Sequence, residues 1–208
     1  MPIRVLVACE FSGIVRDAFN ALSGFHAMSC DLLASEGVSG GDHYLGDVRE
    51  ILYQGWDLLI AHPPCTYLAN SGVRWLHERP GRWEKLDMAG EFFRLLMDAP
   101  IPHIAIENPI MHRYGVKRIG RRQDQVLQPW QFGCGETKAI CLWLKNLPLL
   151  EKTNVVDGRT ARVHRASPTP DRWKERSRFY PGIAAAMATQ WGAYVSASLR
   201  SGAASSPD

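Results

Sequence analysis

The stretch Ile3-Arg-Val-Leu-Val-Ala-Cys-Glu-Phe-Ser-Gly13 is the part of the chain that says most about the fold. Its first seven residues form a β-branched, apolar run that predicts a strand, and Phe11-Ser-Gly13 breaks this run. Residues 14–22 follow with apolar positions at helical spacing. A strand, a glycine-containing turn and a helix in this order are typical of an α/β fold, in which a ligand can approach the backbone of the turn closely.

The same alternation of strand and helix continues along the chain. Further strands are predicted at 25–30, 57–61 and 103–106, a weaker one at 137–144, and helices at 49–53, 84–97 and 183–199. The 208 residues fit a single domain, which we assign to residues 1–200, with a flexible tail at 201–208. The sequence therefore predicts an α/β fold with a mostly parallel sheet.

Composition excludes several classes of protein. The chain is 46% apolar and 22% charged, as in ordinary globular proteins and unlike disordered ones. No apolar run approaches the roughly 20 residues of a membrane span, and the first residues lack the layout of a signal peptide. Five cysteines without a CxxC pair indicate neither a disulfide framework nor a zinc site. We therefore expect a cytoplasmic protein that holds no metal.

Charge is distributed unevenly between the two halves of the chain. Residues 1–112 contain 8 Lys and Arg against 14 Asp and Glu, whereas residues 113–208 contain 16 against 7. Most of the positive charge lies in residues 113–122 and 159–178, whose weak periodicity and Gly or Pro content predict loops. Such basic loops indicate contact with a nucleic acid or nucleotide, although a solvated basic surface has the same composition.

Chemically interesting residues follow the predicted strands at the points where the strands end. Carboxyl ends of parallel strands meet at one edge of a sheet, so these residues can build one site. Asp31 can accept hydrogen bonds from ribose hydroxyls and Asp47 from an adenine amino group, but each can equally be a loop or capping acid. The chain contains no GxGxxG, so a dinucleotide site is not expected.

A cysteine and a glutamate stand at two of these strand ends. Cys65 follows two prolines and enters the polar loop 66–72, which favours a nucleophile over a core thiol. Glu107 directly follows an apolar strand, where it can share a proton with a substrate; a surface acid capping the next turn is the alternative. A thiolate that adds to carbon 6 and an acid that protonates nitrogen 3 are what activates carbon 5 of cytosine.

The ordered motifs resemble those of the DNA cytosine-5 methyltransferases. Phe11-Ser-Gly13 resembles the FxG cofactor motif and Gly46-Asp-Val48 the GDI-type motif. Pro63-Pro-Cys-Thr-Tyr-Leu-Ala-Asn-Ser-Gly72 resembles the PPCQxFSxxG catalytic loop, and Glu107-Asn-Pro109 resembles ENV. The resemblance spans residues 5 to 145 in the family's order and implies a Rossmann-like fold that binds S-adenosylmethionine.

The resemblance implies a role for each matched residue. Cys65 attacks carbon 6, Glu107 protonates nitrogen 3, and Pro64 and Asn108 support the loop. The cofactor-binding residues would be Phe11, Ser12, Gly13, Asp31, Asp47, Val48 and Pro63. In this family the target base is flipped out of the DNA duplex into the pocket.

Two departures from the family concern substrate binding. The QxRxR segment falls at residues 136–140, where Lys138 stands for the first arginine and Ile140 replaces the second. We expect Lys138 with Arg176 or Arg178 to hold the cytosine. Only residues 147–181 are available in place of a target-recognition domain, so we expect a basic loop there. This implies weak sequence specificity, a specificity partner, or a free nucleotide substrate.

The leading hypothesis is therefore methylation of cytosine carbon 5 in DNA. Short proteins of this layout are familiar from phage, so the resemblance places the reaction in a bacterial cell or a phage-infected host. The alternatives are the same chemistry on a free nucleotide such as dCMP or dCTP, and a DNA-binding relative without turnover. A thiol hydrolase would need a histidine base; His62 is close to Cys65, but the sequence shows no residue to orient it. Residues 183–192 can replace the family's cofactor-covering helix or can simply pack.

Overall fold

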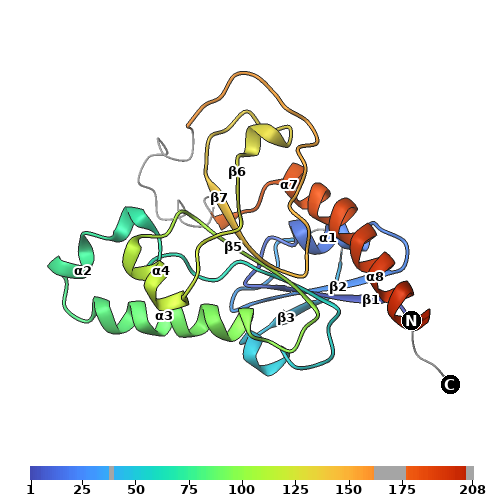
Figure 1. Cartoon of the computed structure of the whole chain (residues 1–208), viewed down its shortest axis with the longest axis horizontal. Coiled ribbons are helices and arrows are strands. Elements are labelled where there is room, and N and C mark those ends of the chain that lie inside the picture. The colour runs from blue at the N-terminus through green and yellow to red at the C-terminus, as the bar shows by residue number, and fades with distance from the viewer. Residues whose placement is uncertain (38–39, 162–176, 205–208) are drawn as a thin grey trace.

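A single seven-stranded sheet forms the centre of the molecule (Figure 1). The structure is a computed structural model that describes residues 1–37, 40–161 and 177–204. The strands are β1 (Ile3–Ala8), β2 (Phe25–Asp31), β3 (His43–Leu45), β4 (Leu58–Ala61), β5 (His103–Asn108), β6 (Gln125–Leu127) and β7 (Ile140–Lys145). They lie side by side in the order β3-β2-β1-β4-β5-β7-β6.

Most of the sheet is parallel. β1 pairs in parallel with β2 and β4, β2 with β3, and β4 with β5, whereas β7 runs antiparallel to both β5 and β6. The first five strands have the doubly wound order 3-2-1-4-5, and β7 is inserted between β5 and β6. The predicted α/β fold with a mostly parallel, Rossmann-like sheet is confirmed.

Helices cover both faces of the sheet. They are α1 (Ile14–Asn20), α2 (Trp75–Glu78), α3 (Arg82–Met97), α4 (Arg113–Ile119), α7 (Pro181–Ala186) and α8 (Gly192–Ala204). Shorter turns are η1 (Val48–Glu50), η2 (Asn70–Gly72) and η3 (Pro129–Gln131), and the π-helical turn η4 (Met187–Trp191) joins α7 to α8. No helix in the described ranges is both long and apolar enough to cross a membrane.

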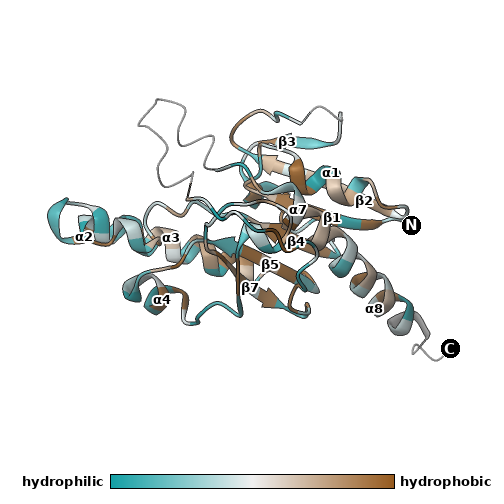
Figure 2. Cartoon of the chain, turned by 90° about the horizontal axis from the view of Figure 1, so that it is seen from above, coloured by the Kyte–Doolittle hydropathy of each residue, from teal (hydrophilic) through white to brown (hydrophobic). Residues whose placement is uncertain are grey.

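The pleat of β1 divides the core into two clusters. Val5 and Val7 face α1, α7 and η4, where Trp191 is fully buried. Leu6 and Ala8 face the other way, toward α3 and its buried Phe93. Figure 2 shows these apolar strands in brown at the centre of the molecule and the hydrophilic α2 in teal at one end. The chain after α7 packs into the first cluster, as the simple packing interpretation of residues 183–192 requires.

The structure corrects three predictions of secondary structure. Residues 113–122, predicted as a loop, contain α4, because His112 caps its first turn through Nδ1 and Gly120 ends it with φ 80°. The strand predicted at 103–106 extends to Asn108 as β5, and residues 201–204 of the predicted tail are helical in α8. Of the predicted basic loop 147–181, residues 162–176 lie outside the described part of the chain.

Candidate active site

The loop after β4 and the end of β5 bring the predicted catalytic residues together. Ala61 of β4 pairs with Ile106 of β5, so His62, the first residue after β4, and Glu107, near the end of β5, lie side by side. Nδ1 of His62 lies 3.3 Å from Oε2 of Glu107. The Asn108 amide donates to the Pro63 carbonyl at 2.9 Å. The catalytic loop and the Glu107-Asn108 pair therefore form one local structure, as the parallel sheet predicted.

Cys65 begins a short helical turn that is held from several sides. Its carbonyl accepts from the amides of Leu68 and Ala69, at 3.0 and 2.8 Å. The Arg82 guanidinium donates to the carbonyl of Thr66 at 3.2 Å. Pro63 is buried, Pro64 is exposed, and Cys65 is half-buried. The backbone that carries the thiol is therefore held in place, and Cys65 is partly exposed to solvent.

His112 joins this loop to α4. Its backbone amide donates to the carbonyl of Leu68, and its ring nitrogen Nε2 lies 2.9 Å from the carbonyl of Tyr67. Nδ1 accepts from the amide of Gly115 at 2.9 Å, so the proton of the neutral ring is on Nε2. Burial lowers the pKa of His112, with smaller contributions from the charges of Arg118 and Arg82. The neutral ring is thus the form that this contact requires.

Buried polar atoms at this site have no protein partner. Among the described residues, Nε2 of His62 and Oδ1 of Asn108 are buried without a hydrogen bond. The other nitrogen of His62 faces Glu107, and its ring lies 4.7 Å from that of Phe179, centroid to centroid. Buried polar groups are nearly always satisfied, so these atoms are available to a ligand. His62, for which the sequence showed no orienting residue, has Glu107 as its partner.

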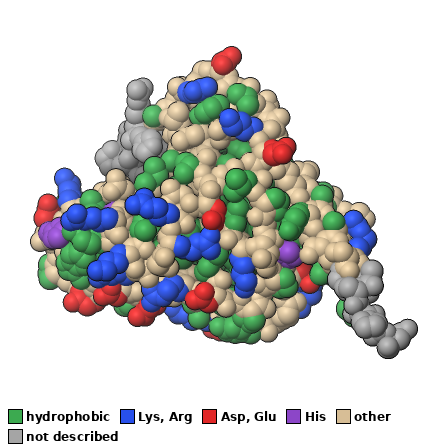
Figure 3. All heavy atoms as spheres, viewed as in Figure 1, with side chains coloured by type: hydrophobic (Ala, Val, Ile, Leu, Met, Phe, Trp, Pro, Cys, Tyr) green, Lys and Arg blue, Asp and Glu red, His purple; other side chains and the backbone are tan. Residues whose placement is uncertain are grey.

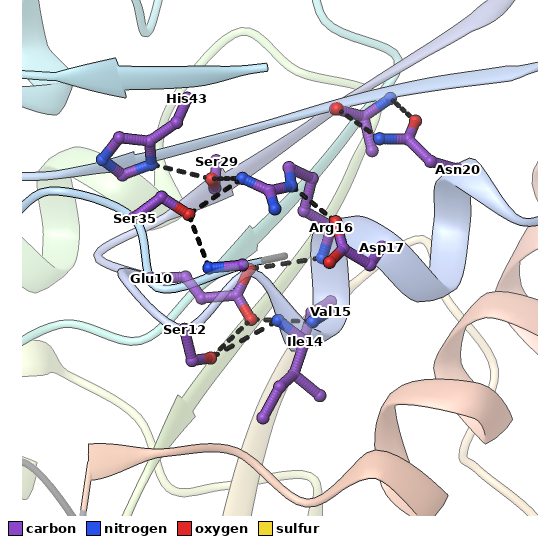
Figure 4. Close-up of polar contacts among 12 residues, drawn as sticks. Glu10, Ser12, Ile14, Val15, Arg16, Asp17, Asn20, Ser29, Ser35 and His43 are labelled. Carbon is purple, nitrogen blue, oxygen red and sulfur yellow. Dashed lines mark hydrogen bonds and ion pairs between the residues drawn. The ribbon is translucent and has the colours of Figure 1, made fainter. Parts of the chain in front are cut away.

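The turn after β1 is organised by a glutamate that the sequence analysis missed. The buried carboxylate of Glu10 accepts from the amides of Val15 and Arg16, at 2.7 and 3.2 Å, and from the Ser12 hydroxyl at 3.2 Å (Figure 4). These amides of the first helical turn are the groups that bind a phosphate in a dinucleotide fold. Because Glu10 occupies them, the turn supports the interpretation that no dinucleotide binds here.

A buried arginine fixes the neighbouring loop. Arg16 is fully buried and donates from Nε to Asp17 at 2.7 Å and from Nη1 to the hydroxyls of Ser29 and Ser35, at 3.0 and 3.2 Å (Figure 4). Gly13 has φ 72°, and a Cβ atom on it would lie 2.5 Å from Nη2 of Arg16. The glycine of the FxG-like motif therefore has a structural role beside the one implied by the resemblance.

Asp31 and Asp47 lie near each other at the carboxyl end of β1. Burial raises the pKa of the Cys9 thiol, and the charges of both carboxylates raise it further, Asp31 more than Asp47. Asp31 accepts from the Leu33 amide at 2.9 Å, and Asp47 caps η1 by accepting from the Arg49 amide at 3.0 Å. Asp47 thus has the capping role, and Asp31 the role of a loop acid, that the sequence left open beside cofactor binding. The other predicted cofactor residues at this edge, Phe11 and Val48, are buried.

The predicted substrate-binding cations are at different places. The ammonium of Lys138 lies 5.5 Å from the ring centroid of Tyr180, whose hydroxyl donates to Glu136 at 3.0 Å. Arg178 donates twice to one oxygen of Glu36, at 2.8 and 3.1 Å, and is thereby engaged with the loop after β2. Arg176 lies outside the described residues. Ile140, which stands where the family has its second arginine, is buried in β7.

Comparison with known proteins finds similarity in structure alone. No family model matches the chain, and no curated protein matches it. The Entamoeba histolytica methyltransferase EhMeth is similar with a TM-score of 0.47 and 12% identity, over 75% of this chain and 58% of that one. An E. coli prophage protein, provisionally described as a DNA modification methyltransferase, is similar with a TM-score of 0.48 and 15% identity, over 80% and 55% of the two chains. This chain thus spans little more than half the length of either, and the proposals below rest on its own residues.

Proposed function

We propose that this chain is an S-adenosylmethionine-dependent methyltransferase that acts on carbon 5 of cytosine in DNA. The observation that carries the proposal is the joining of the two catalytic loops. Asn108 donates to the Pro63 carbonyl at 2.9 Å, two residues before Cys65, and Glu107 is the neighbour of Asn108 in β5. A half-buried thiol and a carboxyl group beside unpartnered polar atoms match the needs of covalent addition to cytosine.

The residues at the β1, β2 and β3 edge fit S-adenosylmethionine. This cofactor carries ribose and adenine but no phosphate, and Glu10 fills the helix amides that a phosphate would need. Asp31 and Asp47 are two nearby carboxylates, and we assign them to the ribose hydroxyls and the adenine amino group. Phe11, Ser12, Gly13, Val48 and Pro63 would complete the pocket. When bound, the cofactor supplies the methyl group.

The protein groups activate and release the base. In the proposed reaction the Cys65 thiolate forms a bond from Sγ to carbon 6, while Glu107 gives a proton to nitrogen 3. These two events make carbon 5 nucleophilic. After methylation, solvent water accepts the proton of carbon 5, the electron pair of that bond restores the double bond between carbons 5 and 6, and Sγ leaves carbon 6 as the thiolate. Nitrogen 3 then returns its proton to Glu107. Asn108 holds the backbone of the Cys65 loop during these steps.

Methyl transfer from labelled S-adenosylmethionine to unmethylated duplex DNA tests the proposal. The product is digested to nucleosides, and we expect label in 5-methyldeoxycytidine for the wild type and none for Cys65→Ala. Cys134→Ala is the matched control, because Cys134 is also half-buried but lies far along the chain from the site.

The same assay separates the alternatives. Label in dCMP or dCTP, with none in DNA, would assign the chemistry to a free nucleotide. Binding of DNA without transfer to any substrate would indicate a relative without turnover. Transfer that survives in Cys65→Ala would contradict the covalent mechanism.

A further inference from the structure

A cationic surface begins where the Cys65 loop ends. α2, the first turns of α3, and α4 bring together basic side chains that lie over aromatic rings. Arg74 and Arg79 lie 4.1 and 3.9 Å from the ring centroid of Trp75. The remaining pairs are Arg82 over Tyr67 at 4.6 Å, Lys85 over Tyr67 at 5.9 Å, and Arg113 over Tyr114 at 4.6 Å. We call these eight residues the cationic platform.

The platform is continuous with the candidate active site. Arg82 lies over the Tyr67 ring and donates to the Thr66 carbonyl, one residue beyond Cys65. Tyr67 in turn presents its carbonyl to His112, which caps α4. Arg82 of the platform therefore also holds the loop that follows Cys65, so a molecule bound at this end of the platform would lie next to that loop.

The arginines of the platform are oriented but not neutralised. Within the described residues, no ion pair involves Arg74, Arg79 or Arg113, and Arg113 donates a hydrogen bond to the Tyr114 hydroxyl at 2.6 Å. A guanidinium that lies over a ring keeps its planar set of donors exposed and loses less entropy on binding. Figure 3 shows blue side chains gathered at the end of the molecule where Figure 1 places α2, with red ones along its lower margin.

Acidic residues nearby do not cancel this charge. Glu78 of α2 and Glu84 of α3 are the acids between residues 66 and 85, against four basic residues there. Asp87 is paired with Arg118 at 2.7 Å. The net charge of the surface is therefore positive, which is the complement of a polyanion.

We propose that the cationic platform binds the phosphate backbone of duplex DNA beside the target cytosine. This inference rests on the proposed function, since it names the surface that brings DNA to Cys65. The ring faces of Trp75 and Tyr67 already carry cations, so they do not offer the bare surfaces on which unpaired bases stack. Contacts of this kind position a protein on DNA without reading its sequence, and so can supply affinity where no full recognition domain is present.

Salt-dependent binding of a 20-base-pair duplex by Arg74→Gln/Arg79→Gln tests the platform. Loss of two phosphate contacts should make the slope of log affinity against log salt less steep by about 2. Arg4→Gln/Arg200→Gln is the matched control: it also removes two charges, one of them over Trp56 at 4.4 Å, away from the platform. We expect this control to keep the wild-type slope.

The outcomes separate the platform from the proposed function. An unchanged slope in Arg74→Gln/Arg79→Gln would overturn the platform even if the wild type methylates DNA. The platform would also be overturned if Arg74→Gln/Arg79→Gln weakened binding of single-stranded DNA but not of the duplex. An equal loss of duplex binding in Arg4→Gln/Arg200→Gln would overturn it as well. A reduced slope in a protein that transfers no methyl group would support the platform and count against the proposed function alone. Thermal unfolding of both variants checks that each remains folded.

Discussion

Glu10, just after β1, and Glu107, near the end of β5, lie at the carboxyl ends of parallel strands of the sheet, yet their surroundings differ. Glu10 is 4% exposed, and its oxygens accept from two helix amides and a serine hydroxyl. The Glu107 side chain is 14% exposed and faces His62, whose second nitrogen has no partner among the described residues. A carboxylate whose oxygens are filled by backbone amides holds the fold, whereas one that faces side chains remains available for chemistry.

The same contrast extends to the two regions around these residues. The β1–α1–β2 region ties its charged groups to one another through Arg16 and Glu10 (Figure 4). In the β4–β5 region, Nε2 of His62 and Oδ1 of Asn108 are buried without a hydrogen bond among the described residues. In the first region the same holds for Nη2 of Arg16, but the other nitrogens of that guanidinium bind Asp17, Ser29 and Ser35. Changes in the first region should therefore affect stability, and changes in the second should affect activity. The following variants test this division.

Replacing Glu107 should have the largest effect on activity. Glu107→Gln keeps the shape of the side chain but removes the proton that nitrogen 3 needs, so the rate of methyl transfer should fall by roughly 10²- to 10⁴-fold. The free energy of unfolding, measured in urea, should change little. Glu10→Gln is the matched control and should lower stability. If Glu107→Gln lowers the free energy of unfolding but keeps the wild-type rate of methyl transfer, the division between the two regions is wrong.

Replacing Arg16 should have the largest effect on stability. Arg16→Met leaves Asp17, Ser29 and Ser35 without their buried donor, which should cost about 3 kcal/mol of the free energy of unfolding. Urea denaturation measures this loss. Arg200→Gln, on exposed surface of α8, provides the baseline. A stability equal to that baseline would show that the Arg16 network does not hold the loop after β2.

The smallest expected effect is the change of stability with pH that His112 causes. This residue joins the Cys65 loop to α4. His112 has a lowered pKa in the folded chain, so the unfolded chain takes up the proton first as the pH falls below about 6.5. The stabilising contribution is complete above that pH and is lost as the pH falls through the folded value. Urea denaturation between pH 5 and 7.5 should show this decline, and it should be absent in His112→Asn, which keeps a capping acceptor.

A second histidine variant makes this test specific. His77→Asn changes an exposed histidine of α2 and should keep the decline of the wild type. If His112→Asn and the wild type lose stability in parallel, other groups account for the pH dependence.

Strand positions could be predicted because their signal is local. The runs 3–8 and 58–61 contain no polar residue except Arg4, the second residue of the first run. The sequence alone therefore predicts that both faces of these strands are buried. Residues that directly follow such runs must leave the sheet at its carboxyl edge. That argument predicts one site for Cys65, Glu107 and Asn108, although β5 continues through Glu107 and Asn108.

α4 could not be predicted with the same argument. Residues 113–122 contain five basic residues and little apolar periodicity. The helix depends on the His112 cap, on Gly120 and on packing against α3. Gly115 also permits close approach to the catalytic loop, because a Cβ atom there would lie 3.3 Å from the Leu68 carbonyl oxygen. These partners are close in space and not all close in sequence.

The sequence by itself thus determined the α/β fold and the edge at which its reactive residues meet, because apolar runs and strand ends are properties of neighbouring residues. Only the tertiary structure decided what each charged group does there. Glu10 binds α1, His62 binds Glu107, and Arg178 binds Glu36 across 142 positions of sequence. Hydrogen bonds and charges act over a few ångströms, and the distances between such side chains are set by the packing of the whole chain.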